Sequence, residues 1–104
     1  MIYNVKATYN PDKLLEFGRY LTDGTIAGQK PDGPEIVDSM KRAKITAPAQ
    51  IEWYEKCYCP TPLQHERRTI YDKYIIILET EETDHYGDVQ GESFWSVLTG
   101  LLEE

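Results

Sequence analysis

The residues best suited to chemistry lie in one stretch near the middle of the sequence. It contains two thiols, an imidazole, two carboxyl groups and a guanidinium, carried by Cys57, Cys59, His65, Glu66, Arg67 and Asp72. Side chains of these kinds bind metals, act as nucleophiles or transfer protons. We therefore consider three kinds of site: a metal site, a reactive-cysteine site and an acid–base site.

The metal hypothesis rests on ligand type. Zinc accepts thiolate and imidazole ligands, which Cys57, Cys59 and His65 carry. A fourth ligand could come from Asp72 or His85. However, the two cysteines lack the two-residue gap of common zinc motifs, and the chain has no second cysteine pair. We therefore favour half-buried thiols with no metal and no cofactor.

A reactive cysteine is the second hypothesis. Cys59 precedes a predicted helix, whose N-terminus would favour a thiolate. Alpha carbons two residues apart on a strand are separated by about 6.6 Å, which is near the upper limit for a disulfide. A bridge between Cys57 and Cys59 would therefore be strained, and the pattern gives little support to a thiol–disulfide role.

The third hypothesis is acid–base chemistry by His65, Glu66 and Arg67 on one helix. Neighbouring helical residues project in different directions, so at most one of the other two joins His65. In a small-molecule enzyme, His65 would act as acid or base while Arg67 or a tyrosine orients an anionic substrate. Alternatively, the three residues form the solvated face of the helix. Whether His65 and a cysteine line one pocket distinguishes these interpretations.

Aromatic residues are unusually frequent, with eight tyrosines and two tryptophans in 104 residues. Aromatic side chains with polar tips are favoured at interfaces and around ligand pockets. Alternatively, they complete a small core and its rim. The candidates for ligand or interface contacts are Trp53, Tyr54, Tyr58 and Tyr71.

The length of the chain suits a single domain covering residues 1–104. We expect its core at about 2–80, followed by an acidic segment and helix at about 81–104. The net charge of −7 is concentrated near the C-terminus, because residues 79–104 contain eight acidic residues and no lysine or arginine. Since nucleic-acid affinity depends mainly on phosphate neutralisation, we expect no nucleic-acid partner.

The sequence also argues against a membrane protein. No apolar run approaches the ~20 residues of a membrane-spanning helix. The N-terminus lacks the basic and apolar regions of a signal peptide. We therefore expect a soluble cytoplasmic protein with reduced cysteines and no membrane partner.

Hydrophobic periodicity predicts strands that alternate with helices. Residues 2–9 and 51–59 alternate between two faces, as in strands with one buried face. The near-continuous apolar run at 74–80 is typical of a strand covered on both faces. Helices are expected after Asn10–Pro11, from a capping box with proline at the first helical position at Thr61–Gln64, and from Phe94 onward.

Residues 35–45 fit two structures. Ile36, Val37 and Met40 fit a helix face, while the spacing of the other elements favours a strand. Choosing the strand, we predict an α+β fold: a ferredoxin-like βαββαβ plait, with an antiparallel sheet and helices on one face, plus an extra C-terminal helix. Choosing the helix gives a three-stranded sheet with four helices.

This order of elements, over about residues 2–80, is similar to that of the dimeric α+β barrel proteins, which pair two such plaits face to face. That superfamily includes small monooxygenases and isomerases, so the resemblance implies a homodimer and a small-molecule ligand. The open sheet face must be polar, covered by the C-terminal helix or buried in a dimer.

Three functions follow from these observations. The leading hypothesis is a homo-oligomeric binding or structural module whose sheet face is completed by a partner chain. The second is a small-molecule enzyme that uses His65. The third is an adaptor whose acidic C-terminal segment docks on a basic partner.

Overall fold

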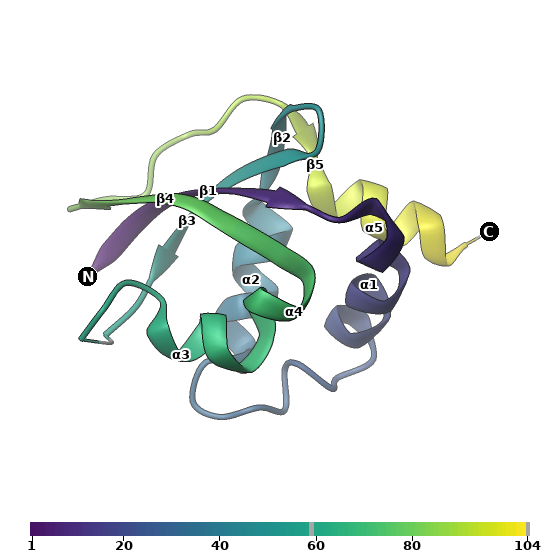
Figure 1. The fold of residues 1–104 in the computed structure, drawn as a ribbon, viewed down its shortest axis with the longest axis horizontal. Coiled ribbons are helices and arrows are strands. Elements are labelled where there is room, and N and C mark those ends of the chain that lie inside the picture. The colour runs from purple at the N-terminus through teal and green to yellow at the C-terminus, as the bar shows by residue number, and fades with distance from the viewer. Residues whose placement is uncertain (59, 104) are drawn as a thin grey trace.

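The structure is a computed structural model that describes residues 1–58 and 60–103. Its strands are β1 (Ile2–Tyr9), β2 (Lys44–Ala47), β3 (Gln50–Lys56), β4 (Ile75–Thr83) and β5 (Glu92–Ser93). They form one antiparallel sheet in the order β4-β1-β3-β2-β5 (Figure 1). The predicted α+β class and antiparallel sheet are therefore confirmed.

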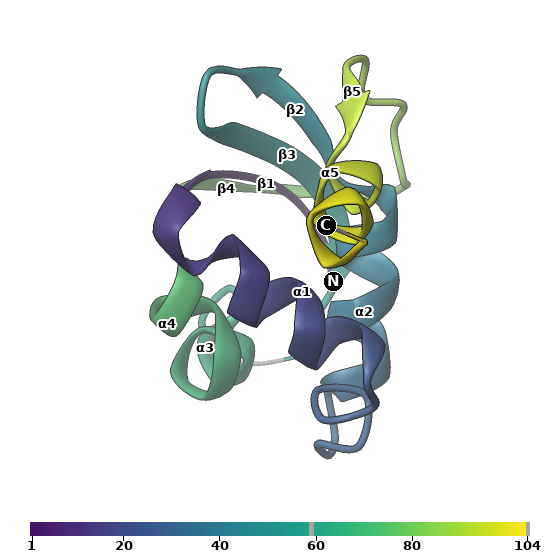
Figure 2. The same ribbon diagram turned by 90° about the vertical axis from the view of Figure 1, so that its right-hand side faces the viewer.

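The helices lie on one side of this sheet and leave its other side open (Figures 1 and 2). They are the 3-10 turn η1 (Pro11–Lys13), α1 (Leu14–Thr22), α2 (Gly33–Arg42), α3 (Gln64–Glu66), the π-helical η2 (Arg67–Tyr71), α4 (Asp72–Tyr74) and α5 (Phe94–Leu102). Because α3, η2 and α4 follow one another without a break, residues 64–74 form one irregular helical segment.

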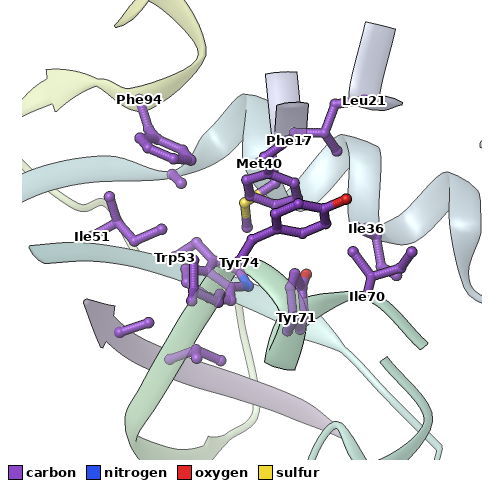
Figure 3. Close-up of a cluster of buried hydrophobic side chains, with 14 of the residues drawn as sticks. Phe17, Leu21, Ile36, Met40, Ile51, Trp53, Ile70, Tyr71, Tyr74 and Phe94 are labelled. Carbon is purple, nitrogen blue, oxygen red and sulfur yellow. The ribbon is translucent and has the colours of Figure 1, made fainter. Parts of the chain in front are cut away.

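The core lies between the sheet and the helices. As the alternation predicts, Tyr3, Val5 and Ala7 of β1 are buried. From α1, the Phe17 ring stacks on Tyr74, with 4.7 Å between the ring centroids (Figure 3). Aromatic rings from a helix and from the segment before β4 therefore fill the space beneath the sheet.

The strand predicted at residues 35–45 is wrong, because α2 occupies most of this segment. Pro34 and Glu35 lie in its first turn, and Lys41 and Arg42 in its last turn, as the helix dipole favours. The strand follows as β2 and pairs with β3. The alternative three-stranded sheet is also wrong, since the described residues form a five-stranded one.

The prediction that the last long strand is covered on both faces is also wrong. β4 is an edge strand whose only neighbour in the described sheet is β1. Ile75 is buried, but Ile76 and Leu78 are 68% and 57% exposed. A continuous apolar run therefore reflects a covered inner face together with exposed apolar residues.

The predicted C-terminal helix is present as α5, but it does not cover the open sheet face. It packs against α1 and α2, with Phe94 and Leu98 buried. A Cβ placed on Gly18 would lie 3.4 Å from Leu98 Cβ, so α1 and α5 pack closely at this position. Within the described part of the chain, no helix has the length and apolar character needed to span a membrane.

Candidate functional site

A cleft of about 550 Å³ opens where the start of α2, the end of β3 and α3 meet. Its lining combines titratable, thiol and aromatic side chains from three separate parts of the chain. These residues are Pro31, Asp32, Glu35, Lys56, Cys57, Tyr58 and His65.

The turn before α3 positions His65 and Glu66, which that helix carries. Leu63 adopts a left-handed backbone with φ of 56° and is fully buried. A branched residue accepts this conformation only where packing compensates for the strain, so the buried side chain anchors the turn. The predicted capping box is wrong: the helix begins at Gln64, and the Thr61 hydroxyl donates to the Gln64 side-chain oxygen at 2.8 Å.

His65 forms the central polar contact of the cleft. Its Nδ1 atom hydrogen-bonds to Oδ2 of Asp32, which lies immediately before α2. The His65 Nε2 atom has no hydrogen-bond partner among residues 1–58 and 60–103. The ring is therefore held at one nitrogen, while the other is available to a ligand.

A thiol and a carboxyl group lie behind this pair. Cys57 and Glu66 are both buried, and the Cys57 Sγ donates to Glu66 Oε2 at 3.5 Å. Burial raises the pKa of Glu66, and the nearby Asp32 charge raises it further. Glu66 therefore stays protonated at higher pH than an exposed glutamate.

A second buried carboxyl group, Glu55, supports the wall of the cleft. Its Oε1 atom accepts hydrogen bonds from Trp53 Nε1 at 2.9 Å and from the Tyr71 hydroxyl at 2.5 Å. Burial raises the pKa of Glu55 to about 8, although the hydrogen bonds from Tyr71 and Trp53 oppose the rise. This network joins β3 to the irregular helical segment.

The opposite wall is tied to the sheet through Glu35. Its Oε2 atom accepts hydrogen bonds from Arg42 at 3.0 Å, Ser39 at 3.4 Å and the Lys56 backbone at 3.3 Å. Arg42 also donates to the Tyr54 carbonyl at 2.9 Å. These contacts fix α2 against β3, so the cleft has a rigid frame.

The structure brings together some of the predicted site residues. His65 and Cys57 line the same cleft, while Glu66 is buried behind them. Arg67 lines a neighbouring hollow. Cys59 lies outside the described residues, and within the described ones no three His, Cys, Asp or Glu residues gather as metal ligands.

The predicted aromatic candidates occupy three different environments. Trp53 and Tyr71 are fully buried (Figure 3), and both donate hydrogen bonds to Glu55. Tyr54 has its hydroxyl beside Gly87, where an added Cβ would lie 2.5 Å away. Tyr58 lines the cleft and is 79% exposed. Much of the aromatic excess is therefore used within the domain.

Sequence reasoning missed three carboxyl groups of this region: Asp32, Glu35 and Glu55. Asp32 lies within residues 24–34, a stretch rich in glycine and proline that suggested only turns. Glu55 offered a clearer signal, because it alternates with less buried positions in the same way as Ile51 and Trp53 and therefore lies on the buried face of the strand. A carboxyl group at a core position requires hydrogen-bond partners, and these mark a specialised site.

Comparison with family models, with curated proteins and with solved structures found no match for this chain.

Proposed function

We propose that this protein binds a small organic molecule in the cleft and catalyses a proton transfer on it, with His65 as acid or base. One observation carries this proposal: Asp32 holds Nδ1 of His65, and Nε2 remains available beside the cleft. Histidine is the side chain best suited to exchange a proton near neutral pH.

The hydrogen bond to Asp32 has two consequences for His65. It favours the tautomer with hydrogen on Nδ1, which leaves the Nε2 lone pair free to accept a proton. The same carboxylate stabilises the imidazolium that then forms, as in other His–carboxylate pairs. Asp32 is thus a positioning residue, and His65 is the group that would touch the substrate.

The groups behind His65 adjust the electrostatics of the site. Glu66 favours its protonated form because it is buried near Asp32. Because Glu66 holds its proton to higher pH than an exposed glutamate, it adds less negative charge around His65 than an ordinary carboxyl group would.

The shape of the cleft suits a small ligand. Its volume of about 550 Å³ falls within the range of small-molecule sites. The Tyr58 ring offers an aromatic surface, and the Lys56 ammonium lies 5.7 Å from its centroid. A ligand with a flat apolar part could therefore lie against Tyr58 and present a polar group to His65.

Acylation of histidine by diethyl pyrocarbonate, in the presence of small aromatic fragments, tests this site. Mass spectrometry of peptides would measure modification of His65 and His85 separately. We expect bound fragments to protect His65 and to shift the NMR signals of Asp32 and Cys57. His85 serves as an internal control, because it is exposed and does not line the cleft.

The variant Asp32→Asn tests whether the reactivity of His65 depends on its contact with Asp32 or only on its exposure to solvent. Loss of the carboxylate should slow acylation of His65 by about ten-fold, because the imidazole loses its charged partner. His85 should react as before. Fragments that protect both histidines equally, or that shift only residues away from the cleft, would contradict the proposed function.

A homodimer formed across the open sheet face is a second candidate, favoured by the exposed Ile76 and Leu78 on β4. The order β4-β1-β3-β2 supports interpretation of the fold as a ferredoxin-like plait, with β5 added beside β2. Such a plait has an open sheet face on which a second copy can pack, as in the dimeric α+β barrels.

Native mass spectrometry with the double variant I76E–L78E tests the dimer. The unmodified chain should give a dimer mass that the variant loses, because two buried carboxylates per chain would oppose association. The control L15E places one such charge on an exposed leucine of α1, on the helical side. A monomeric unmodified chain would exclude this candidate.

A further inference from the structure

A second hollow, of about 510 Å³, lies along the α3 and η2 part of the helical segment. Its lining carries two guanidinium groups and one carboxyl group, so its formal charge is positive. The lining residues are Thr61, Pro62, Gln64, Arg67, Arg68, Asp72 and Thr80.

The two arginines have unused hydrogen-bonding capacity. Neither Arg67 nor Arg68 forms an ion pair with a carboxylate of the described residues. The Nε atom of Arg67 is buried and has no hydrogen-bond partner among them. The same guanidinium group lines the hollow, where its other nitrogen atoms can donate hydrogen bonds to an oxygen-bearing ligand.

The two hollows are connected along the helical segment. A small depression of about 130 Å³ is lined by Pro60, Gln64, His65 and Arg68. It shares His65 with the cleft, and it shares Gln64 and Arg68 with the second hollow. Because helical residues three and four apart lie on one side, His65 and Arg68 face the same groove.

The charge along this groove is uneven. The cleft at His65 is lined by Asp32 and Glu35, with Lys56 as the single ammonium group. A ligand anion is therefore disfavoured at that end and favoured at Arg67 and Arg68. Guanidinium groups bind carboxylates and phosphates through two parallel hydrogen bonds, which also orients the ligand.

We infer that the substrate is an organic anion, whose carboxylate or phosphate group binds Arg67 and Arg68 while its uncharged part lies beside His65. Because this assignment rests on the proposed function, it specifies which class of molecule the cleft accepts. It also assigns Arg67 and Arg68 as specificity-determining residues, because they select for charge at a distance from the reacting group.

Three probes of similar size test the assignment on the full chain: phenyl phosphate, benzoate and uncharged benzyl alcohol. Titrations followed by NMR should show that one or both anions bind about ten-fold more tightly than benzyl alcohol. All bound probes should shift the signals of His65 and Cys57.

Charge-removing variants locate the source of that preference. In Arg68→Gln, the anions and benzyl alcohol should bind within about two-fold of one another. Arg68 is exposed, so this variant remains informative even where Arg67→Gln fails to fold. The matched control Arg19→Gln removes an exposed arginine on α1 and should keep the preference.

The outcomes separate the two proposals. If benzyl alcohol shifts His65 while the anions bind no more tightly, the anionic substrate class is wrong and the proposed function stands. The same holds if the preference survives in the double variant R67Q–R68Q. If the anions bind at the arginines and no probe reaches His65, the proposed function fails and the substrate assignment fails with it.

Discussion

Two histidines of this chain each contact a carboxylate, yet only one pair lies in a candidate site. His65 meets Asp32, 33 residues away in sequence, and the two side chains are 39% and 20% exposed. His85 meets its neighbour Asp84 at 2.7 Å, with 75% and 95% exposed. The contacts are alike, but only the first pair is held by tertiary structure.

The surroundings of the two pairs shift the pKa values of their carboxyl groups, or of carboxyl groups close to them, in opposite directions. Hydrogen bonding to His85 lowers the pKa of Asp84, which remains in water. Near His65, burial raises the pKa of both Glu55 and Glu66. A histidine–carboxylate contact alone therefore does not indicate a site, whereas a contact backed by buried carboxyl groups with raised pKa values does.

The largest expected effect comes from removing the support beneath the cleft pair. Tyr71→Ala deletes a fully buried ring, its packing on Trp53 and its hydrogen bond to Glu55. We expect a loss of about 3–5 kcal/mol in the free energy of unfolding, measured by urea denaturation. The control Tyr86→Ala lies beside the exposed pair and loses a cation–π contact with Arg42, so it should cost less than about 1 kcal/mol. If both variants lost the same free energy of unfolding, the two regions would not differ in how firmly they are packed.

The raised pKa of Glu55 predicts how stability depends on pH. Its folded pKa of about 8 exceeds its ordinary value of 4.5, so the folded protein holds a proton that the unfolded chain releases. Stability is therefore fully present below pH 4.5 and falls as pH rises toward 8, by about 1.4 kcal/mol per pH unit. Between pH 5 and 7, Glu55 should account for a loss of about 3 kcal/mol.

Glu55→Gln isolates this contribution, because glutamine keeps the shape of the protonated acid without titrating. Urea denaturation at several pH values should give the variant a flatter profile than the unmodified chain. Two profiles with the same slope would show that Glu55 does not hold a proton in the folded protein.

Much of the fold could be predicted from the sequence because local signals agreed with burial. The alternation of residues 2–9 and the apolar stripe of α5 report which face is covered, and both were confirmed. The strand at 35–45 failed because spacing between elements was preferred to the charge pattern of α2. The charges at the two ends of this segment are those that favour a helix, and the segment is helical.

The candidate site was less predictable, because its parts come from distant segments. His65, Glu66 and Cys57 could be singled out by residue type alone. Asp32 could not, since its contact with His65 depends on how α2 and α3 pack. Only Glu55, a carboxyl group at a buried strand position, carried a signal that could have been recognised.

The polar pairs themselves should differ in their effect on stability. Asp32→Asn weakens a partly buried contact to His65, and we expect a loss of about 1 kcal/mol in the free energy of unfolding. Asp84→Asn removes a contact that is exposed to water, so it should give no resolvable change. Urea midpoints for the two variants, measured side by side, test this. A measurable loss for Asp84→Asn alone would reverse the comparison.

The backbone shows the same contrast between a packed and an unpacked site, with the smallest expected effect. Leu63 and Ala49 both have left-handed backbones, with φ of 56° and 59°. At Leu63 the buried side chain compensates for the strain, whereas Ala49 lies in the turn between β2 and β3 with only a methyl group. Ala49→Gly should therefore raise the free energy of unfolding by about 0.5 kcal/mol, because glycine adopts this conformation without strain. Leu63→Gly relieves the same strain but loses buried apolar surface, so it should destabilise the fold by about 2 kcal/mol or more. A stabilising Leu63→Gly, measured by thermal unfolding, would show that strain rather than packing governs the turn that carries His65.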